Sequence, residues 1–297
     1  MWYFITLIAP VLWGTSYAFM ESGLDNGLPL WNALFRALPA GLLLLLIKPV
    51  AFDRKTLSYG SMVGFLNIGV FFVCMFIATY RIPGSLVATL GATMPIQVMI
   101  IRRVLYGVKP DAWQIAAGFL GLFGVYLLLS GSEMPLDAIG VGVALLGMFS
   151  MSLATVIMQH HGMTENVIGF MGTQLVAGAV FILPIAYVVE GSIPSYNTSE
   201  IMTLGWLSVV NTAIGYLIWL YGIKRIGVFN ASLLTLINPV VAVLLGVLYM
   251  KDQISLIQFM AIGLILFSVS LPNLSVCLLN ILRIAFKRDK KSELAVD

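Results

Sequence analysis

Charged side chains are scarce in this chain. Asp, Glu, Lys and Arg make up 10% of its 297 residues, hydrophobic residues make up 60%, and the mean hydropathy is +1.00. Soluble domains carry roughly 25% charged residues. So few charges could not cover a water-soluble globule of this size. The composition therefore excludes that class and indicates a polytopic membrane protein.

Cysteines and enzyme motifs are also scarce. Cys74 and Cys277 both lie in apolar stretches, so we expect two buried thiols and no disulfide framework. No spacing matches a metal site or a nucleophile with its base. The glycine-rich stretches 118–124 and 140–147 lack the strand–loop–helix context of a nucleotide loop, and close helix packing explains them. We expect no enzymatic activity, no cofactor, no metal and no nucleic-acid partner.

Long apolar stretches predict an all-α membrane protein of ten transmembrane helices. A bilayer core about 30 Å thick needs roughly 17–25 apolar residues per helix. The stretch after Met1 lacks the basic region of a signal peptide and is counted as the first span. The ten expected spans are 2–20, 30–47, 59–79, 84–101, 112–130, 139–158, 167–189, 200–221, 229–249 and 256–276.

The basic residues orient these spans, because cytoplasmic loops retain Lys and Arg. With both termini in the cytoplasm, the outer segments hold only Arg81 and Lys251, and Arg36 lies within a span. The inner segments hold Lys48, Arg54, Lys55, Arg102, Arg103, Lys109, Lys224, Arg225, Arg283, Lys287, Arg288, Lys290 and Lys291. This asymmetry predicts a multi-pass protein of a plasma membrane, the inner membrane of a bacterium.

A repeat is visible at an offset of 144 residues. The offset pairs Asn67 with Asn211, Arg81 with Arg225, Pro95 with Pro239 and Gln114 with Gln258. We expect a first repeat over 1–131, a second over 132–276 and a basic cytoplasmic tail over 277–297. Five spans per repeat is an odd number, so the two repeats have inverted topology, which is common in alternating-access transporters.

Pro95 and Pro239 lie inside the fourth and ninth spans. A proline in a helix removes one backbone hydrogen bond and crowds the carbonyl four residues earlier, here that of Gly91 and of Thr235. One interpretation is a packing kink. The other is a bend that opens a binding cavity and leaves carbonyls available to a substrate.

Uncharged polar and aromatic residues recur within the spans. Each one alone is explained by contacts between helices, but a polar stripe such as Thr89, Thr93 and Gln97, spaced four apart, favours a cavity-facing surface. The candidate substrate cavity consists of Trp13, Tyr17, Arg36, Asn67, Thr89, Thr93, Gln97, Ser152, Asn211, Tyr216, Trp219 and Asn238.

Arg36 lies about 10 Å below the outer end of its span, at 1.5 Å per residue. Its long side chain could reach the interface. Alternatively it pairs with Glu21 as an outer gate, or it faces the cavity and attracts an anionic group. We favour the last interpretation.

Deep carboxylates, which proton-driven cation exporters use, are missing from every span. His160 and His161 fall in an inner loop and are explained as a solvated turn. We therefore expect a facilitator that moves its substrate down a gradient, with coupling through Glu21 as the alternative.

The motifs LWGTSYAF (12–19) and LFRALPAG (34–41), the proline-centred fourth and ninth spans and the stretch 211–255 resemble the drug/metabolite transporter superfamily, EamA type. The resemblance covers nearly the whole chain. It implies a bacterial plasma-membrane exporter of amino acids or related metabolites, with a central cavity lined by helices 1, 3, 4, 6, 8 and 9. Trp13, Gly14, Arg36, Pro95 and Pro239 match the family's positions.

The chain departs from the family after each proline span. Where the family commonly has Gly-Glu, the first repeat reads YGVKP with Val108, and the second reads MKDQI with Asp252. This puts the family's usual gating contacts in doubt here.

The leading functional hypothesis is a secondary transporter that exports amino acids or related small metabolites by alternating access. The alternatives are a multidrug or nucleotide-precursor transporter of the same fold and a non-transporting membrane scaffold. The expected partners are a small-molecule substrate and the lipid bilayer. The substrate, the direction, the coupling ion and the oligomeric state stay open.

Overall fold

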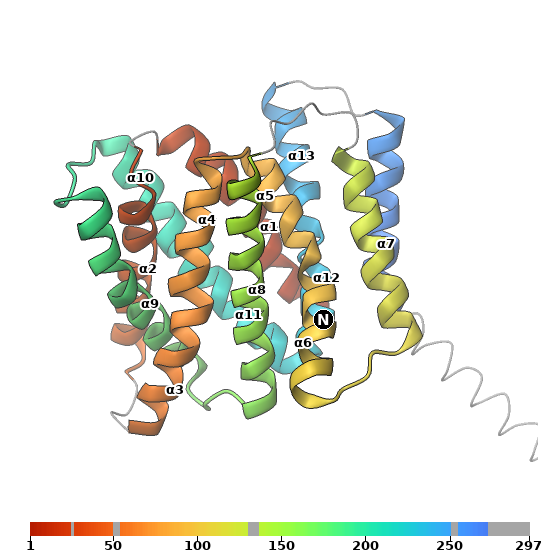
Figure 1. Ribbon diagram of the computed structural model, residues 1–297, viewed down its shortest axis with the longest axis horizontal. Helices are drawn as coiled ribbons and strands as arrows, with labels where there is room; N and C mark the ends of the chain where they lie inside the picture. Colours follow the sequence, from red (N-terminus) through yellow and green to blue (C-terminus); the bar gives the residue numbers. More distant parts are fainter. Residues whose placement is uncertain (25–26, 50–53, 130–136, 251–254, 273–297) are drawn as a thin grey trace, which may run out of the picture.

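The computed structural model describes residues 1–24, 27–49, 54–129, 137–250 and 255–272 (Figure 1). The side chains of Tyr17, Glu21, Ser85, Leu129, Ala242 and of residues 54–56 and 246–250 are not part of this description. Two predicted features, Cys277 and the tail 277–297, also lie outside the described residues, as do Lys251 and Asp252. Cys74 is buried, as the sequence predicts.

The described residues are helical throughout, apart from short connections. The first half contains α1 (Trp2–Gly23), α2 (Pro29–Ile47), α3 (Arg54–Gly64), η1 (Phe65–Val70), α4 (Phe71–Thr79), α5 (Gly84–Leu90), η2 (Gly91–Thr93), α6 (Met94–Tyr106) and α7 (Ala112–Leu129). The second half contains α8 (Ala138–His161), α9 (Val167–Glu190), α10 (Thr198–Trp206), η3 (Leu207–Ile214), α11 (Gly215–Ile226), α12 (Val228–Leu234), α13 (Ile237–Met250) and a last helix, Leu256–Pro272.

Within the described residues, seven helical stretches are long and apolar enough to cross a membrane. They are Trp2–Met20, Pro29–Ile47, Leu57–Thr79, Ala138–His161, Val167–Glu190, Thr198–Ile226 and Val228–Leu245. The chain is thus a multi-pass, all-helical membrane protein. The other three predicted spans are helical too, but 84–106 is divided into short pieces, and the helices at 112–128 and 256–272 are shorter. The count of ten crossings stays a prediction.

Contacts between helix ends define one end of the bundle, which we call the basic end. Asn166, at the start of α9, donates to the carbonyl oxygen of Pro49 after α2 (2.9 Å). His160 and His161 were expected in a loop, but they form the last turn of α8. The His160 ring stacks on Tyr106 at the end of α6, with centroids 3.6 Å apart. Basic residues gather on the segments that meet here: Lys48, Arg102, Arg103, Lys109, Lys224 and Arg225.

Glu190 joins two helices at the opposite end. Its two carboxylate oxygens accept from the backbone N–H groups of Leu30 (2.8 Å) and Trp31 (2.9 Å). An acid at this point satisfies unpaired donors in the first turn of α2 and complements the positive end of its dipole. The start of α2 and the end of α9 are therefore held together.

Helices of the two halves pack side by side through this bundle, with α2 against α9, α4 against α8, and α1 against α11 and α13 (Figure 1). Glycine allows the closest approaches. A Cβ on Gly64 would lie 2.5 Å from the carbonyl oxygen of Gln174, and one on Gly41 would lie 2.9 Å from the backbone nitrogen of Val176. The α9 backbone therefore lies close to the backbones of both α2 and α3.

Candidate substrate cavity

Two π-helical turns interrupt the long helices on either side of the bundle centre. The first, η1, contains Asn67, and the second, η3, contains Asn211. A π-turn holds one extra residue, locally breaks the regular backbone bonding and is often found at functional sites. Both turns have a buried asparagine, and both use the altered backbone to bind a neighbouring helix.

Asn211 ties η3 to α1. Its amide nitrogen lies 2.6 Å from the carbonyl oxygen of Leu12 and 2.7 Å from the hydroxyl of Ser16, and its backbone oxygen accepts from the Trp13 indole N–H (2.9 Å). These bonds fix the rotation of α1 relative to η3. The Trp13 ring is thereby held at the centre of the molecule.

Asn67 ties η1 to α9 in the other half. Its amide donates to Gln174 Oε1 (3.0 Å), and the Gln174 amide in turn approaches the sulfur of Met158 (3.6 Å). The Ser150 hydroxyl of α8 donates to the carbonyl oxygen of Leu66 in the π-turn (2.8 Å). All of these groups are neutral.

Arg36 of α2 meets η3 with a charged side chain that is only 2% exposed. Its Nε donates to the Thr212 hydroxyl (2.9 Å), and its Nη2 lies 3.5 Å from the Ser16 hydroxyl. The guanidinium carbon is 4.8 Å from the centroid of the Phe72 ring, a cation–π distance. A buried guanidinium in a membrane span is a marker of function. The predicted pairing with Glu21 concerns a side chain outside the described residues.

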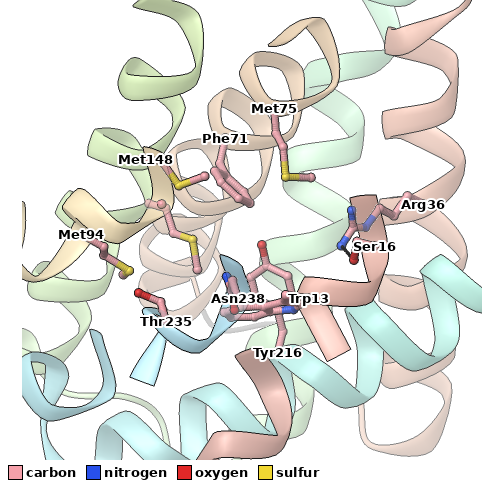
Figure 2. A pocket seen from close by; sticks show the side chains of 12 residues that line it. Trp13, Ser16, Arg36, Phe71, Met75, Met94, Met148, Tyr216, Thr235 and Asn238 are labelled. Atoms are coloured by element: carbon pink, nitrogen blue, oxygen red, sulfur yellow. Dashed lines mark hydrogen bonds between the residues drawn. The ribbon is translucent and has the colours of Figure 1, made fainter. Parts of the chain in front are cut away.

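A small cavity of about 30 Å³ lies between these groups, with Arg36 and Ser16 at one edge (Figure 2). A space of this size holds about one water molecule. Helices of both halves contribute to its wall. The lining residues are Trp13, Ser16, Arg36, Phe71, Met75, Gly91, Met94, Met148, Met151, Tyr216, Thr235 and Asn238.

The wall has an aromatic side and a thioether side. The Trp13 ring is tilted against Tyr216, with centroids 5.1 Å apart, and against Trp219 at 5.2 Å. Figure 2 shows Met75 and Met148 across the cavity from Trp13 and Tyr216. Asn238 lies beside the aromatic pair, and its Oδ1 is buried without a hydrogen-bond partner among the described residues. An N–H group entering the cavity would satisfy it.

The two proline-containing helices break where they reach the cavity. The carbonyl oxygens of Gly91 and Thr235 were expected to be available to a substrate. Instead they accept from the backbone N–H groups of Met94 and Asn238, respectively, through tight i→i+3 turns. The tighter turn replaces the bond that the proline removes. Both prolines therefore create bends at the cavity, but the two carbonyls already have partners.

Of the predicted cavity residues, the structure brings Trp13, Arg36, Tyr216 and Asn238 into the lining. Asn67, Asn211 and Trp219 are buried beside it and hold the surrounding helices. Thr93, Gln97 and Ser152 form a hydrogen-bonded string between α6 and α8, with Gln97 bonded to both hydroxyls (2.9 and 2.8 Å). Thr89 is partly buried outside the lining, and the Tyr17 side chain is outside the described residues.

Sequence reasoning missed the apolar part of the wall. Met75, Met94, Met148, Met151 and Phe71 come from three different spans and have no shared motif. The chain has 15 methionines, and nothing in the spacing of the four cavity methionines separates them from core or lipid-facing residues. The available signal was that each lies within a turn or two of a polar residue in the same span.

A polar network spans the end opposite to the basic end. Asn32 of α2 donates to the Tyr80 hydroxyl (2.9 Å) and accepts from the Tyr196 hydroxyl (2.9 Å). Tyr80 donates to the carbonyl oxygen of Leu24 (3.0 Å). Burial, followed by the nearby Glu190 carboxylate, raises the pKa of Tyr196 above its ordinary value. The phenol therefore stays protonated. The network links the start of α2 to the ends of α1 and α4 and to the segment before α10, on Arg36's side of the molecule.

Comparison with known proteins decides the family. The model of the EamA-like transporter family matches residues 1–130 and 138–274. The chain belongs to the EamA-like transporter family. The resemblance in its motifs is thus confirmed, and the protein is a membrane transporter by family.

EamA-like relatives match over most of their length. Protein PecM of Dickeya dadantii (strain 3937) is 32% identical over 259 residues, covering 86% of each chain. The uncharacterized inner membrane transporter YedA of Escherichia coli (strain K12) is 27% identical, over 89% of this chain and 88% of its own. A solved crystal structure at 18% identity has a TM-score of 0.76 and covers 94% of this chain and 98% of its own, which shows a shared fold.

Proposed function

We propose that this chain is a secondary transporter of the inner membrane of a bacterium that exports amino acids or related small metabolites by alternating access. The observation that carries the proposal is the cavity itself. Residues 1–131 and 132–276 both contribute to its wall, and the wall combines a cation, a buried acceptor and an aromatic pair. Transporter relatives and the family match support the general class.

An inverted repeat of two five-span halves is part of the proposal, and irregular backbone at the expected offset supports it. η1 contains Asn67 and η3 contains its partner at the 144-residue offset, Asn211. The tight turn at 91–93 has a counterpart at Thr235–Leu236. Arg36 lies seven residues after Pro29 at the start of α2, and Gln174 lies seven residues after Val167 at the start of α9. In an inverted pair, such positions lie at opposite depths. The positive-inside rule then assigns both termini and the basic end to the cytoplasm.

The cavity's polar groups support a substrate with an anionic end and a donor. Arg36 places a positive charge in the wall, which suits a carboxylate, and Asn238 Oδ1 offers an acceptor for an N–H group. The rings of Trp13 and Tyr216 give a surface for the side chain between them. An α-amino acid has these features, and so do related small acids.

The small volume indicates a closed state. A cavity of about 30 Å³ has room for about one water molecule, so the substrate enters only when helices move apart. The network of Asn32, Tyr80 and Tyr196 closes the end near Arg36. In this proposal, release to the outside requires that network to open. Facilitated movement down the substrate gradient needs no further group.

The four cavity methionines support a second candidate, a multidrug transporter. Thioether side chains are flexible and polarizable, and methionine-rich surfaces suit partners of several shapes. Competition separates the two candidates. A narrow set of amino acids that compete for flux favours the first, and competition by chemically diverse aromatic compounds favours the second.

Counterflow in proteoliposomes tests the proposal. Vesicles loaded with one amino acid should accumulate the same labelled amino acid from outside, for some member of a panel of amino acids. Asn238→Ala should lose this exchange, because the acceptor in the cavity is removed. Asn230→Ala is the matched control, since the Asn230 amide of α12 donates to the carbonyl oxygen of Ile226 at the end of α11 (2.8 Å) and Asn230 is outside the lining. Equal exchange in both variants would refute the proposed site.

A further inference from the structure

A large apolar groove lies on the outside of the bundle, between α2, α3 and α9. Its volume is about 730 Å³, far larger than that of the central cavity. Leu42 and Leu46 of α2 are 48% and 82% exposed along it, and Val180 of α9 is 62% exposed. In a membrane-spanning protein, such side chains face hydrocarbon. The groove is therefore open to lipid.

The depth of the groove follows from the packing of α9. Glycines at 41 and 64 let α2 and α3 approach the α9 backbone closely, as described above. The α9 surface is thus recessed between two neighbours, and its small side chains Thr173 and Ala177 line the groove. The leucines of α2 lie on one side. Residues from Leu57 to Phe65 lie on the other.

An aromatic pair marks the inner end of the groove. Phe65 and Phe181 meet edge-to-face, with centroids 4.5 Å apart, near the middle of the bundle. From Thr173 to Phe181, the helix rises about 12 Å at 1.5 Å per residue. One leaflet of a hydrocarbon core about 30 Å thick is about 15 Å deep. The groove is thus comparable in length to the hydrocarbon region of a single leaflet.

The other end of the groove lies at the basic end of the bundle. Pro49 lines it, and the bond from Asn166 to the Pro49 carbonyl oxygen keeps the segment after α2 beside the start of α9. Lys48, the residue before Pro49, is exposed, and its ammonium group can reach the headgroup region. Glu165 lies on the connection before α9, so a zwitterionic headgroup is compatible with this end as well.

We propose that this groove is a specific phospholipid site, in which one acyl chain lies along α9 and the phosphate contacts Lys48. The aromatic pair at the inner end, the length of one leaflet and the cation beside Pro49 together match a phospholipid. The inference depends only on the membrane location of the protein. It is independent of what the central cavity transports.

Native mass spectrometry of the full chain, extracted in mild detergent from liposomes of phosphatidylethanolamine and phosphatidylglycerol, tests the site. One phospholipid should stay bound at detergent concentrations that remove the rest. Ala177→Trp fills the groove and should abolish this retention, whereas Ala18→Trp, at an exposed position of α1, should keep it. Lys48→Gln should weaken retention about fivefold, as expected for one lysine near a membrane surface, and Lys109→Gln should not.

A second measurement uses the unaltered protein, so it does not depend on folding of the variants. A phospholipid with a diazirine in its acyl chain, reconstituted with the protein, should crosslink mainly to 42–46 and 173–181. Even labelling of all lipid-facing helices would overturn the proposal. So would equal loss of lipid in Ala177→Trp and Ala18→Trp, or a protein dimer that only Ala177→Trp disrupts, because a second copy of the chain would then occupy the groove.

Discussion

The two π-helical turns, η1 and η3, are built from the same backbone irregularity and the same buried asparagine, yet their surroundings differ. Around η1, Asn67 contacts Gln174, and all partners are neutral. Around η3, Asn211 holds α1 in place, and the guanidinium of Arg36 bonds to Thr212. The η3 side contributes Trp13, Ser16 and the charged Arg36 to the cavity wall, whereas Phe71, directly after η1, contributes an apolar ring.

The difference indicates how two similar turns can take on different roles. A π-turn supplies freed backbone groups wherever it occurs, and helix packing can use them. A neutral amide pair is sufficient for packing in a membrane. A buried cation is costly there, and it is retained where it does something that an amide does not. By this argument, η1 joins helices through neutral groups, and η3 holds α1 and Arg36 beside the proposed substrate cavity.

The largest expected effect is a difference in substrate affinity between alanine variants of Arg36, near η3, and of Gln174, near η1. Arg36→Ala should weaken substrate binding at least about 30-fold, since truncating one partner of a buried charged contact costs about 2–5 kcal/mol. Gln174→Ala, its counterpart in α9, should leave affinity unchanged within about threefold. Ligand-dependent thermal shifts of both purified variants measure this. Equal losses would remove the distinction between the two turns.

Replacing Asn211 should lower the free energy of unfolding more than replacing Asn67. Asn211→Ala removes amide contacts to Leu12, Thr15 and Ser16, whereas Asn67→Ala removes one contact, to Gln174. Buried hydrogen bonds between membrane helices contribute about 0.6 kcal/mol on average, so we expect losses of about 1–2 and about 0.6 kcal/mol, respectively. Unfolding in detergent by a denaturant measures both. A larger loss for Asn67→Ala would reverse the assignment.

The network of Asn32, Tyr80 and Tyr196 should make the stability of the fold depend on pH. No such dependence is expected from the neutral groups around η1. The folded-state pKa of Tyr196 is raised, chiefly by burial, so this group stabilises the fold below a pH of about 10 and loses that contribution as pH rises further. Tyr196→Phe should cost about 1 kcal/mol at pH 7 through the lost bond to Asn32. It should also weaken the alkaline loss of stability.

Thermal unfolding between pH 7 and 11 measures this effect. Tyr187→Phe, at a position 63% exposed on α9, is the control and should behave as the unaltered protein does. If Tyr196→Phe loses stability with alkali as steeply as the unaltered protein, the buried phenol does not contribute to the network as argued.

The smallest expected effect concerns the link between α4 and α8 at the same end. Asp137 accepts from the backbone N–H of Ile139 and from Arg81 (2.6 Å), and these contacts, the Ile139 N–H first, lower its pKa. Its contribution is therefore present above a pH of about 4 and is lost as the pH falls through the lower folded-state value. Asp137→Asn should cause a slight loss at neutral pH and a flatter acid transition, because the exposed ion pair is weak. Asp111→Asn, at the start of α7, is the control.

Much of the architecture is readable from the residues. Apolar runs predict the helices, since a bilayer leaves the backbone no other way to satisfy its hydrogen bonds locally. The paired Asn67 and Asn211 predict related positions in two halves, and the structure has a π-turn at each. Trp13, Arg36, Tyr216 and Asn238 were predicted for the cavity because polar and aromatic groups are unusual inside a span.

The remainder of the wall was out of reach of sequence reasoning. Met75 and Met148 are apolar residues in apolar helices, and their position depends on helix rotation. Asn67 and Trp219 carry the same signal as the cavity residues but are used for packing. The carbonyls of Gly91 and Thr235 were expected to be available, and a local tightening of the helix gave them partners.

By itself, the sequence determined the membrane environment, the helical spans, the basic end of the bundle and the residues that are too polar for lipid. These properties follow from composition and local periodicity, which act within one helix. Only the tertiary structure decided which π-turn meets Arg36, which methionines surround the cavity and where α9 is recessed to form a groove. Those outcomes depend on how helices rotate and approach one another, and distant side chains acting together set that geometry.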